Sequence, residues 1–231
     1  MGVLERNPLT LQKLSLSAGL LFSILIAAQG FDFFYFVQQW PGSFCDISSS
    51  CCYPVTGKPA PDFSIHGFWP NNNDGTYPFN CDLANAFNAS KISDLNGGLT
   101  THWPSLACPS SNGESFWQHE WLKHGTCSES ILDEHAYFKA VLSLRGSIDI
   151  LGALQKARIQ PNNGMYSFTS INNALTNYLA HTPGIECNSA ANGQNQLYQI
   201  YVCVATDATT LIDCPILPQS HCSSQLLFPS F

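Results

Sequence analysis

The chain contains few charged residues, and basic residues are the scarcest. Only 11% of its 231 residues are charged, less than half the roughly 25% of a typical soluble domain. The 9 lysines and arginines stand against 16 acidic residues, which gives a net charge of −7. This balance excludes a protein that clamps nucleic acid by neutralising many phosphates, but it is compatible with an enzyme that contacts only a few.

Long apolar runs are also scarce. The longest covers residues 14–28 (LSLSAGLLFSILIAA), follows basic residues, and ends in the small residues Ala28 and Gly30. It is shorter than the roughly 20 residues of a membrane-spanning helix and is typical of a secretory signal peptide. A retained membrane anchor is the alternative. We expect residues 1–30 to be removed and residues 31–231 to form one domain that no membrane holds.

Cysteine, in contrast, is abundant, and all 10 cysteines lie beyond this leader. An even number in an exported chain predicts five disulfides. Zinc ligands and free thiols are the alternatives, but the paired CxxC spacing typical of zinc sites does not occur. Spacing alone leaves the pairing open. One N-glycosylation sequon, Asn88-Ala89-Ser90, is consistent with export.

Apolar patterning predicts both strands and helices. Strands are expected at residues 31–40, 62–69 and 197–205, the second ending before Pro70. Helices are expected from Ser115 to Gly125, with a capping box at Ser115 and Gln118, and at residues 131–145, 148–158 and 171–180. Because strands and helices do not alternate regularly, we predict a single α+β domain held by disulfides.

One predicted helix carries a concentration of titratable residues, in FWQHEWLKHGTC. At about 100° per residue, Glu120, Lys123 and His124 fall on one helical face, and His119 lies four residues before Lys123. Nearby tryptophans indicate partial burial, which tunes the pKa of imidazoles. The alternative is a solvated helix face with an ordinary Glu–Lys pair.

The same segment begins like the zinc-protease motif H-E-x-x-H. That motif needs its second histidine four residues after the first, so that both bind one metal. Here Lys123 occupies that position, and its ammonium group would repel a dication. We therefore expect neither a metal nor any other cofactor.

A second segment, SIHGFWP, places His66 on a predicted strand. A lone histidine on a strand is usually structural, but Gly67 leaves room for a ligand and Trp69 offers a flat stacking surface. Two histidines from separate segments, with a lysine and a carboxylate, suffice for phosphodiester transfer. One imidazole removes a proton from the attacking hydroxyl and the other protonates the leaving oxygen. The other histidines, at positions 102, 135, 181 and 221, are expected on the surface or in packing roles.

Together, SIHGFWP and FWQHEWLKHGTC resemble the two active-site signatures of the RNase T2 family. The resemblance is closest to plant S-like secretory ribonucleases and extends through FDFFYFVQQWPGSFC, CCYP and NNNDGTYPFNCD. Phe68 departs from the leucine usual in the first signature, an apolar exchange that leaves the chemistry undisturbed. A pI near 5.3 favours the S-like branch over the self-incompatibility ribonucleases, which tend to be basic.

This resemblance implies that the protein cleaves single-stranded RNA without a metal. His124 would be the base that activates the ribose 2′-hydroxyl, and His66 the acid that protonates the leaving 5′-oxygen. The product would be a 2′,3′-cyclic phosphate, hydrolysed more slowly to a 3′-phosphate. DNA lacks the nucleophile and would not react.

The resemblance gives the remaining site residues supporting roles. Glu120 and Lys123 would stabilise the pentacoordinate phosphorane, His119 would hold the phosphate, and Trp69 would stack on a base. Glu120 should favour the charged form of a nearby imidazole whereas Lys123 should oppose it. The residues therefore leave the pH optimum open, while the family suggests a mildly acidic one.

The family also has an α+β fold in which helices pack around a central antiparallel sheet. It implies the disulfides Cys45–Cys51, Cys52–Cys108, Cys81–Cys127, Cys187–Cys222 and Cys203–Cys214. We expect a monomer that is secreted to the extracellular space, with the vacuole as the alternative. The competing function is a catalytically inactive storage or defence protein on the same fold; such a protein would be expected to have lost His66 or His124, and both are present.

Overall fold

The computed structural model describes residues 30–46 and 51–231. The predicted signal peptide lies outside the described residues, except for Gly30, and remains a prediction. The elements of the described chain are β1 (Phe33–Gln39), α1 (Pro41–Asp46), β2 (Ser64–Asn71), η1 (Ala89–Leu95), α2 (Asn96–His102), α3 (Glu114–Lys123), η2 (Gly125–Ser128), α4 (Glu134–Ser147), α5 (Ile150–Lys156), β3 (Gly164–Ser167), α6 (Phe168–Leu179), β4 (Gly184–Ser189), β5 (Asn195–Val204), β6 (Leu211–Ile212) and β7 (Gln225–Phe228).

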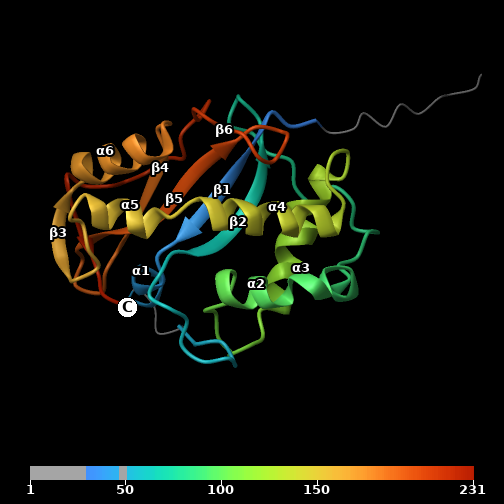
Figure 1. Cartoon of the computed structure of the whole chain (residues 1–231), viewed down its shortest axis with the longest axis horizontal. Helices are drawn as coiled ribbons and strands as arrows, with labels where there is room; N and C mark the ends of the chain where they lie inside the picture. The colour runs from blue at the N-terminus through green and yellow to red at the C-terminus, as the bar shows by residue number, and fades with distance from the viewer. Residues whose placement is uncertain (1–29, 47–50) are drawn as a thin grey trace, which may run out of the picture.

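Within the described chain, the strands form one seven-stranded sheet. Its main path runs β2-β1-β5-β7-β3, and β4 and β6 also pair with β5. All pairs are antiparallel except β5 with β7, which is parallel. Helices α4 and α5 cross the sheet in the view of Figure 1, whereas α2 and α3 lie to one side of it. The predicted α+β class with helices around a mostly antiparallel sheet is confirmed.

Strand β1 is apolar from Phe33 to Val37, and both of its faces are buried. Phe34 and Phe36 belong to the main core, which also takes in the buried residues of the helices. Phe33, Tyr35 and Val37 point to the opposite face and join a smaller cluster. A strand covered on both faces reads as a continuous apolar run rather than an alternating one, as this segment does.

Strand β2 continues through Pro70 to Asn71, so the prediction that Pro70 ends it is wrong. Pro70 lies opposite Phe34 of β1. β2 is the terminal strand of the sheet path and pairs with a neighbour on one side only. The missing N–H of a proline is therefore less costly there than in a central strand, which uses hydrogen bonds on both sides. Edge positions are where strands tolerate proline.

The three later helices form where the sequence predicts them, with starts set by side-chain caps. Asp133 accepts a hydrogen bond from the Ala136 amide at the start of α4, and Asp149 and Ser167 cap α5 and α6 in the same way. These caps satisfy amides that have no partner within the helix. They move each start by two or three residues from the predicted position.

Helix α3 begins earlier than predicted, and the expected capping box does not form. Its N-cap is Gly113, with a φ of 91° that glycine adopts readily, so Ser115 lies inside the helix. The helix ends at Lys123, close to the predicted end at Gly125. A Cβ on Gly125 would lie 2.3 Å from the ring of Trp121, so this glycine is required by packing.

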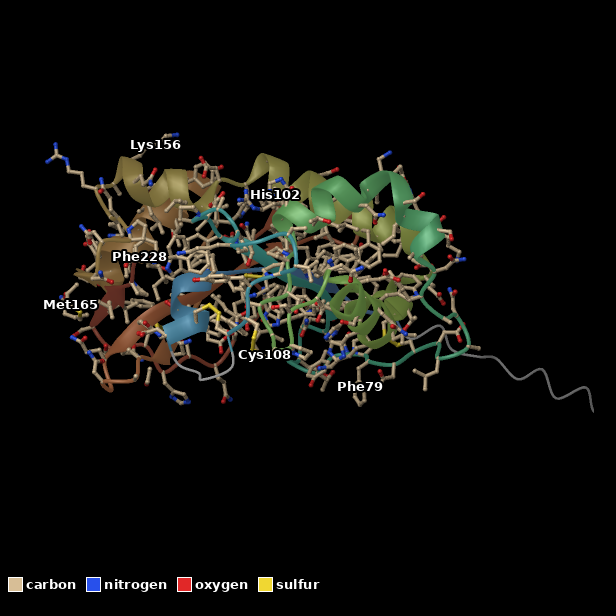
Figure 2. All side chains as sticks on the ribbon, turned by 90° about the horizontal axis from the view of Figure 1, so that it is seen from below. Phe79, His102, Cys108, Lys156, Met165 and Phe228 are labelled. Atoms are coloured by element: carbon tan, nitrogen blue, oxygen red, sulfur yellow. A yellow bond between two sulfur atoms is a disulfide. The ribbon has the colours of Figure 1, made fainter. Side chains whose placement is uncertain are left out.

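Five disulfides join the ten cysteines in the pairs that the family resemblance implies: Cys45–Cys51, Cys52–Cys108, Cys81–Cys127, Cys187–Cys222 and Cys203–Cys214. Figure 2 places Phe228 among packed side chains and Lys156 and Met165 at the periphery. Among the described helices, none has the length and apolar character needed to cross a membrane.

Candidate active site

A cavity of about 330 Å³ opens where α3 meets β2 and the face of the sheet that carries the smaller cluster. It brings together all six residues predicted for the site, although they come from two segments that lie 50 residues apart in the sequence. The lining residues are Tyr35, His66, Trp69, Asn71, Tyr77, His119, Glu120, Lys123, His124 and Tyr201.

His66 lies in the middle of β2 and is held from two sides. Its backbone carbonyl accepts a hydrogen bond from Trp103 Nε1 at 3.1 Å. Its ring Nδ1 lies 2.6 Å from Gln199 Oε1, an oxygen that can only accept, so Nδ1 carries the hydrogen. Burial lowers the pKa of His66, as do Lys123 and His119, while the bond to Gln199 opposes them.

His124 is the C-cap of α3 and is almost fully buried, with 6% of its surface exposed. Its ring stacks on the indole of Trp69, with centroids 5.2 Å apart. Nδ1 is buried and has no hydrogen-bond partner within the described chain. Burial lowers the pKa of His124 to about 3, with further lowering by Lys123, His119 and His66. The imidazole is therefore neutral, and able to accept a proton, at mildly acidic pH.

Glu120 lies beneath the cavity with 2% of its surface exposed. Its Oε2 accepts a hydrogen bond from Trp69 Nε1 at 2.8 Å. Burial raises the pKa of Glu120 to about 8, against smaller opposing effects of that bond and of Lys123. A carboxyl group that is neutral at mildly acidic pH does not stabilise an imidazolium, which corrects the expectation that it would favour the charged form. No ion pair within residues 30–46 and 51–231 joins Glu120 to Lys123.

Gly67 is explained by this hydrogen bond rather than by a ligand. A Cβ at position 67 would lie 2.0 Å from Trp69 Nε1 and 2.5 Å from Glu120 Oε2. The space that the sequence suggests for an approaching ligand is thus filled by the protein itself. Glycine here lets the indole and the carboxyl group meet across β2.

His119 and Lys123 lie toward the outer part of the site, where His119 is exposed and Lys123 half-buried. Burial and the charge of Lys123 lower the pKa of His119. The carbonyl of Lys123 accepts a hydrogen bond from the Asn80 amide at 2.9 Å. This bond and the Cys81–Cys127 disulfide hold the segment that carries Tyr77 against the end of α3.

Trp69 contacts both catalytic candidates from one indole. Its ring stacks on His124 and meets the ring of His66 edge-on, with centroids 5.0 Å apart. It therefore has an internal positioning role that the sequence reasoning missed. Its predicted stacking on a substrate base remains a prediction.

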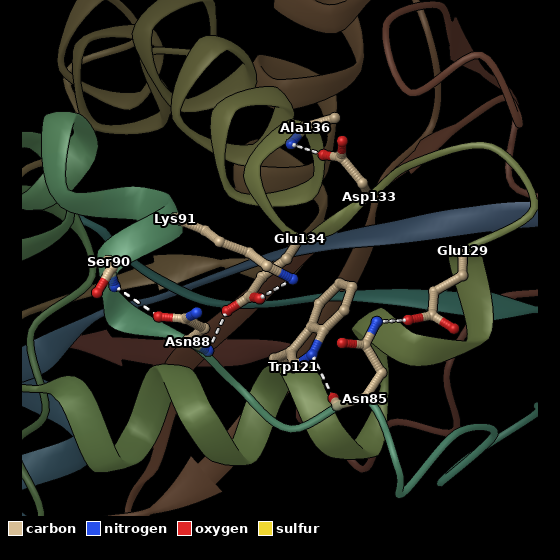
Figure 3. Close-up of polar contacts among 9 residues, drawn as sticks. All are labelled: Asn85, Asn88, Ser90, Lys91, Trp121, Glu129, Asp133, Glu134 and Ala136. Atoms are coloured by element: carbon tan, nitrogen blue, oxygen red, sulfur yellow. Dashed lines mark hydrogen bonds and ion pairs between the residues drawn. The ribbon is translucent and has the colours of Figure 1, made fainter.

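The far side of α3 is fixed by polar contacts shown in Figure 3. Trp121 Nε1 donates to the carbonyl of Asn85 at 3.1 Å. The buried carboxylate of Glu134 accepts from the Asn88 amide at 2.7 Å and pairs with Lys91 at 3.2 Å. These contacts anchor the segment before α2 to α3 and α4, so that both faces of α3 are held.

Sequence reasoning also missed the residues that β5 contributes. Gln199 is buried behind His66, and its Nε2 donates to Glu186 on β4 at 3.2 Å. Tyr201 donates to the same carboxylate oxygen at 2.6 Å. The available signal was a glutamine within the otherwise apolar run LYQIYVCVA, but the sequence gives no indication of which histidine it would meet.

The remaining histidines lie outside the cavity lining, as predicted. His135 and His181 pair with Asp94 and Asp213 at 3.0 and 3.2 Å near the surface. Across the described residues, no group of three or more histidine, cysteine, aspartate or glutamate side chains is arranged to hold a metal ion.

Comparison with known proteins identifies the family. A sequence model described as the Ribonuclease T2 family matches residues 31–214. The chain is 55% identical over 210 residues to extracellular ribonuclease LE of Solanum lycopersicum, spanning 90% of this chain and 91% of that protein. It is 52% identical over 210 residues to intracellular ribonuclease LX of the same plant, spanning 90% and 88%.

A solved structure shares the fold over nearly the same region. The crystal structure of RNase NT in complex with 5′-AMP superposes with a TM-score of 0.85 at 54% identity, covering 88% of this chain and all of that one. Both histidine segments lie within the residues that the family model matches. The chain belongs to the Ribonuclease T2 family of enzymes.

Proposed function

We propose that the protein is a secreted endoribonuclease that cleaves single-stranded RNA by transphosphorylation without a metal ion. His124 removes the proton from the ribose 2′-hydroxyl, whose oxygen attacks the adjacent phosphorus. His66 protonates the 5′-oxygen as its bond to phosphorus breaks. The product is a 2′,3′-cyclic phosphate, which water opens more slowly to a 3′-phosphate.

The observation that carries this proposal is the placement of two imidazoles with different surroundings in one cavity. His66 and His124 contact the same indole from different elements, as a base and an acid on opposite sides of one phosphate require. The lowered pKa of His124 keeps that ring neutral and suits it to the role of base. Because burial also lowers the pKa of His66, its acid form is favoured by lower pH.

Other residues around the cavity supply electrostatic stabilisation. The ammonium group of Lys123 can pair with the phosphoryl oxygens as negative charge accumulates on them. Glu120, kept protonated by burial, can donate a hydrogen bond to the same oxygens while its Oε2 accepts from Trp69. His119, exposed near Lys123, binds the phosphate, and Trp69 stacks on a base.

The leader and the sequon support secretion. We infer that residues 1–30 direct the chain into the secretory pathway and that the domain acts as a monomer outside the cell; the vacuole is the alternative. Asn88 is exposed, and its Oδ1 accepts a hydrogen bond from the Ser90 amide at 3.0 Å. Its amide nitrogen thus remains accessible for an N-linked glycan, away from the cavity.

Digestion of single-stranded RNA in the presence of EDTA tests the function. The oxidised protein is compared with His124→Phe and with His135→Phe, a control that replaces a histidine outside the cavity. We expect cyclic-phosphate products from the wild type and the control, and none from His124→Phe. A strand with one 2′-deoxynucleotide should resist cleavage at that position only, because the nucleophile is missing there.

The result that would overturn the proposal is equally specific. A folded, fully disulfide-bonded protein that does not cleave RNA would support the inactive storage or defence protein. Cleavage that EDTA abolishes, or that leaves a 5′-phosphate, would contradict metal-free attack by the 2′-hydroxyl.

A further inference from the structure

Behind His66, a chain of hydrogen bonds runs through the sheet away from the cavity. His66 on β2 contacts Gln199 on β5, and Gln199 contacts Glu186 on β4. Gln199 is a buried glutamine, 4% exposed, in a strand whose neighbouring residues are mostly apolar. A buried amide is costly unless its polar atoms are paired, and here both ends of the amide have partners.

The order of donors and acceptors fixes the orientation of the Gln199 amide. A carboxylate accepts hydrogen bonds and does not donate them. The amide NH₂ of Gln199 must therefore face Glu186, which turns its oxygen toward His66. An amide oxygen only accepts, so Nδ1 of His66 must carry a hydrogen. The carboxylate thus determines the tautomer of a histidine that it does not touch.

Tyr201 holds the far end of this chain. Its hydroxyl donates to Glu186 Oε2 at 2.6 Å, the oxygen that also accepts from Gln199. Burial raises the pKa of Tyr201, as does its bond to Glu186, so the hydroxyl remains a donor. The two hydrogen bonds together hold the Glu186 carboxylate in place.

We propose that Gln199 and Glu186 are positioning residues that fix His66 as the Nδ1–H tautomer and present Nε2 to the substrate. The proposal rests on the proposed function, in which His66 is the general acid. In the acid form both nitrogens carry hydrogen, and Nε2–H is the one transferred to the leaving 5′-oxygen. Afterwards the neutral ring already has its hydrogen on Nδ1 and can accept a proton again at Nε2.

The charged and titratable groups around His66 explain why such support is needed. Burial disfavours its protonated form most, and Lys123 and His119 of α3 add to this; His124 lies across the shared indole. Glu120 is separated from it by Trp69. The bond from Nδ1 to Gln199 is the contact that favours the protonated ring.

Three variants and a matched control test the proposal through the pH dependence of cleavage. Gln199→Leu removes the acceptor of the His66 hydrogen bond, and Gln199→Glu keeps an acceptor but adds a negative charge. Glu186→Gln allows the side-chain amide of Gln199 to rotate by 180°, which would exchange its oxygen and nitrogen. The control is Gln196→Leu, which removes another buried glutamine from β5 whose amide instead donates to the Ser43 carbonyl. Cleavage of a dinucleotide is measured from pH 4 to 8, giving kcat and KM separately.

We expect Gln199→Leu to lower kcat by about 10-fold, a part of what a general acid contributes, with KM little changed. The pH at which activity falls on the alkaline side should move down in Gln199→Leu and up in Gln199→Glu. Glu186→Gln should give a smaller change in the direction of Gln199→Leu. The proposal is overturned if Gln199→Leu has the same pH profile and kcat as Gln196→Leu.

Nitrogen NMR of His66 separates this proposal from the proposed function. In the resting wild-type protein, above the pKa of His66, Nδ1 should carry the hydrogen, and in Gln199→Leu the two tautomers should mix. If the wild type does not cleave RNA, the function fails while this measurement still decides the tautomer. If the wild type cleaves RNA and His66→Phe does not, yet the tautomer is unchanged in Gln199→Leu, only the positioning role fails.

Discussion

The two histidines of the site have the same side chain but differ in their secondary structure and in the hydrogen bonding of Nδ1. His66 lies on a strand, and its Nδ1 donates to a buried amide. His124 closes a helix, stacks on Trp69, and has a buried Nδ1 without a partner in the described residues. Burial lowers the pKa of both, but for His66 a hydrogen bond opposes the effect. The difference teaches that the surroundings, rather than the residue type, distinguish the two imidazoles and suit them to the proposed roles of acid and base.

Exchanging either imidazole for an apolar ring should give the largest effect. We expect His66→Phe and His124→Phe each to lower kcat by about 10³-fold, within the range for general acid–base groups. The double variant should lose much less than the product of the two losses, because the two groups act as a unit. Steady-state cleavage of a dinucleotide measures all three, and a loss below about 10-fold in either single variant would contradict the assignment.

A substrate with a better leaving group should then separate the two variants. A nitrophenolate needs little protonation as it leaves, so a nucleoside 3′-nitrophenyl phosphate should restore much of the activity of His66→Phe. It should not restore His124→Phe, in which the nucleophile is still not activated. Equal rescue of both variants would mean that the roles of base and acid are not divided in this way.

Glu120→Gln should have an intermediate effect. The amide keeps an acceptor for Trp69 Nε1 but removes the acidic proton that burial retains on Glu120. We expect kcat to fall by about 10- to 100-fold, near the cost of weakening one donor to a developing oxyanion. The tryptophan fluorescence spectrum should stay the same as in the wild type, because the hydrogen bond to Trp69 is kept. Unchanged kcat would show that this proton takes no part.

Gly67→Ala should destabilise the protein, because it disturbs the contact between Trp69 and Glu120. The added methyl group would overlap Trp69 Nε1 and Glu120 Oε2, so we expect a loss of about 1–3 kcal/mol in the free energy of unfolding. Gly97→Ala is the control, because a Cβ there meets no atom within 4 Å. Urea denaturation compares them, and equal stability of the two variants would contradict the close contact at Gly67.

The pH dependence of stability should follow from the two buried groups with the largest shifts, Glu120 and His124. Glu120 binds its proton more tightly when folded, with a pKa of about 8 against 4.5, so its contribution to stability falls as pH rises across that interval. His124 binds its proton less tightly, with a pKa of about 3 against 6.5, so its contribution rises with pH across that interval and is then constant. Of these two contributions to the free energy of unfolding, only that of Glu120 still changes between pH 6.5 and 8, where it falls as pH rises.

Urea denaturation at several pH values checks this expectation. Glu120→Gln should remove the decline in unfolding free energy above pH 6.5 that the wild type shows. A decline of the same size in both proteins would assign it to another group.

These features differ in how far the sequence predicts them. Local patterns suffice for β1, whose aromatic run indicates burial on both faces, and for the clustering of Glu120, Lys123 and His124 at the end of one helix. Gly67 is misread from the sequence because a glycine that makes room for the protein's own side chains looks the same as one that makes room for a ligand.

Contacts between distant residues are the part that the sequence does not predict. Gln199 lies 133 residues from His66, and only the pairing of β1 with both β2 and β5 brings the two together. The neutral state of Glu120 also depends on burial that no local pattern records. Consequently the residue types of the site are predictable from the sequence, whereas their protonation states are not.

The central claim is that burial in one cavity lowers the pKa of both His66 and His124, and that a hydrogen bond opposes this effect at His66. Titration of the wild-type protein by histidine NMR, with resonances assigned from His66→Phe and His124→Phe, tests it most directly. We predict that His124 titrates near pH 3 and that His66 titrates below 6.5, with neither following the other. Titration of His124 near 6.5, as for an exposed imidazole, would contradict the account.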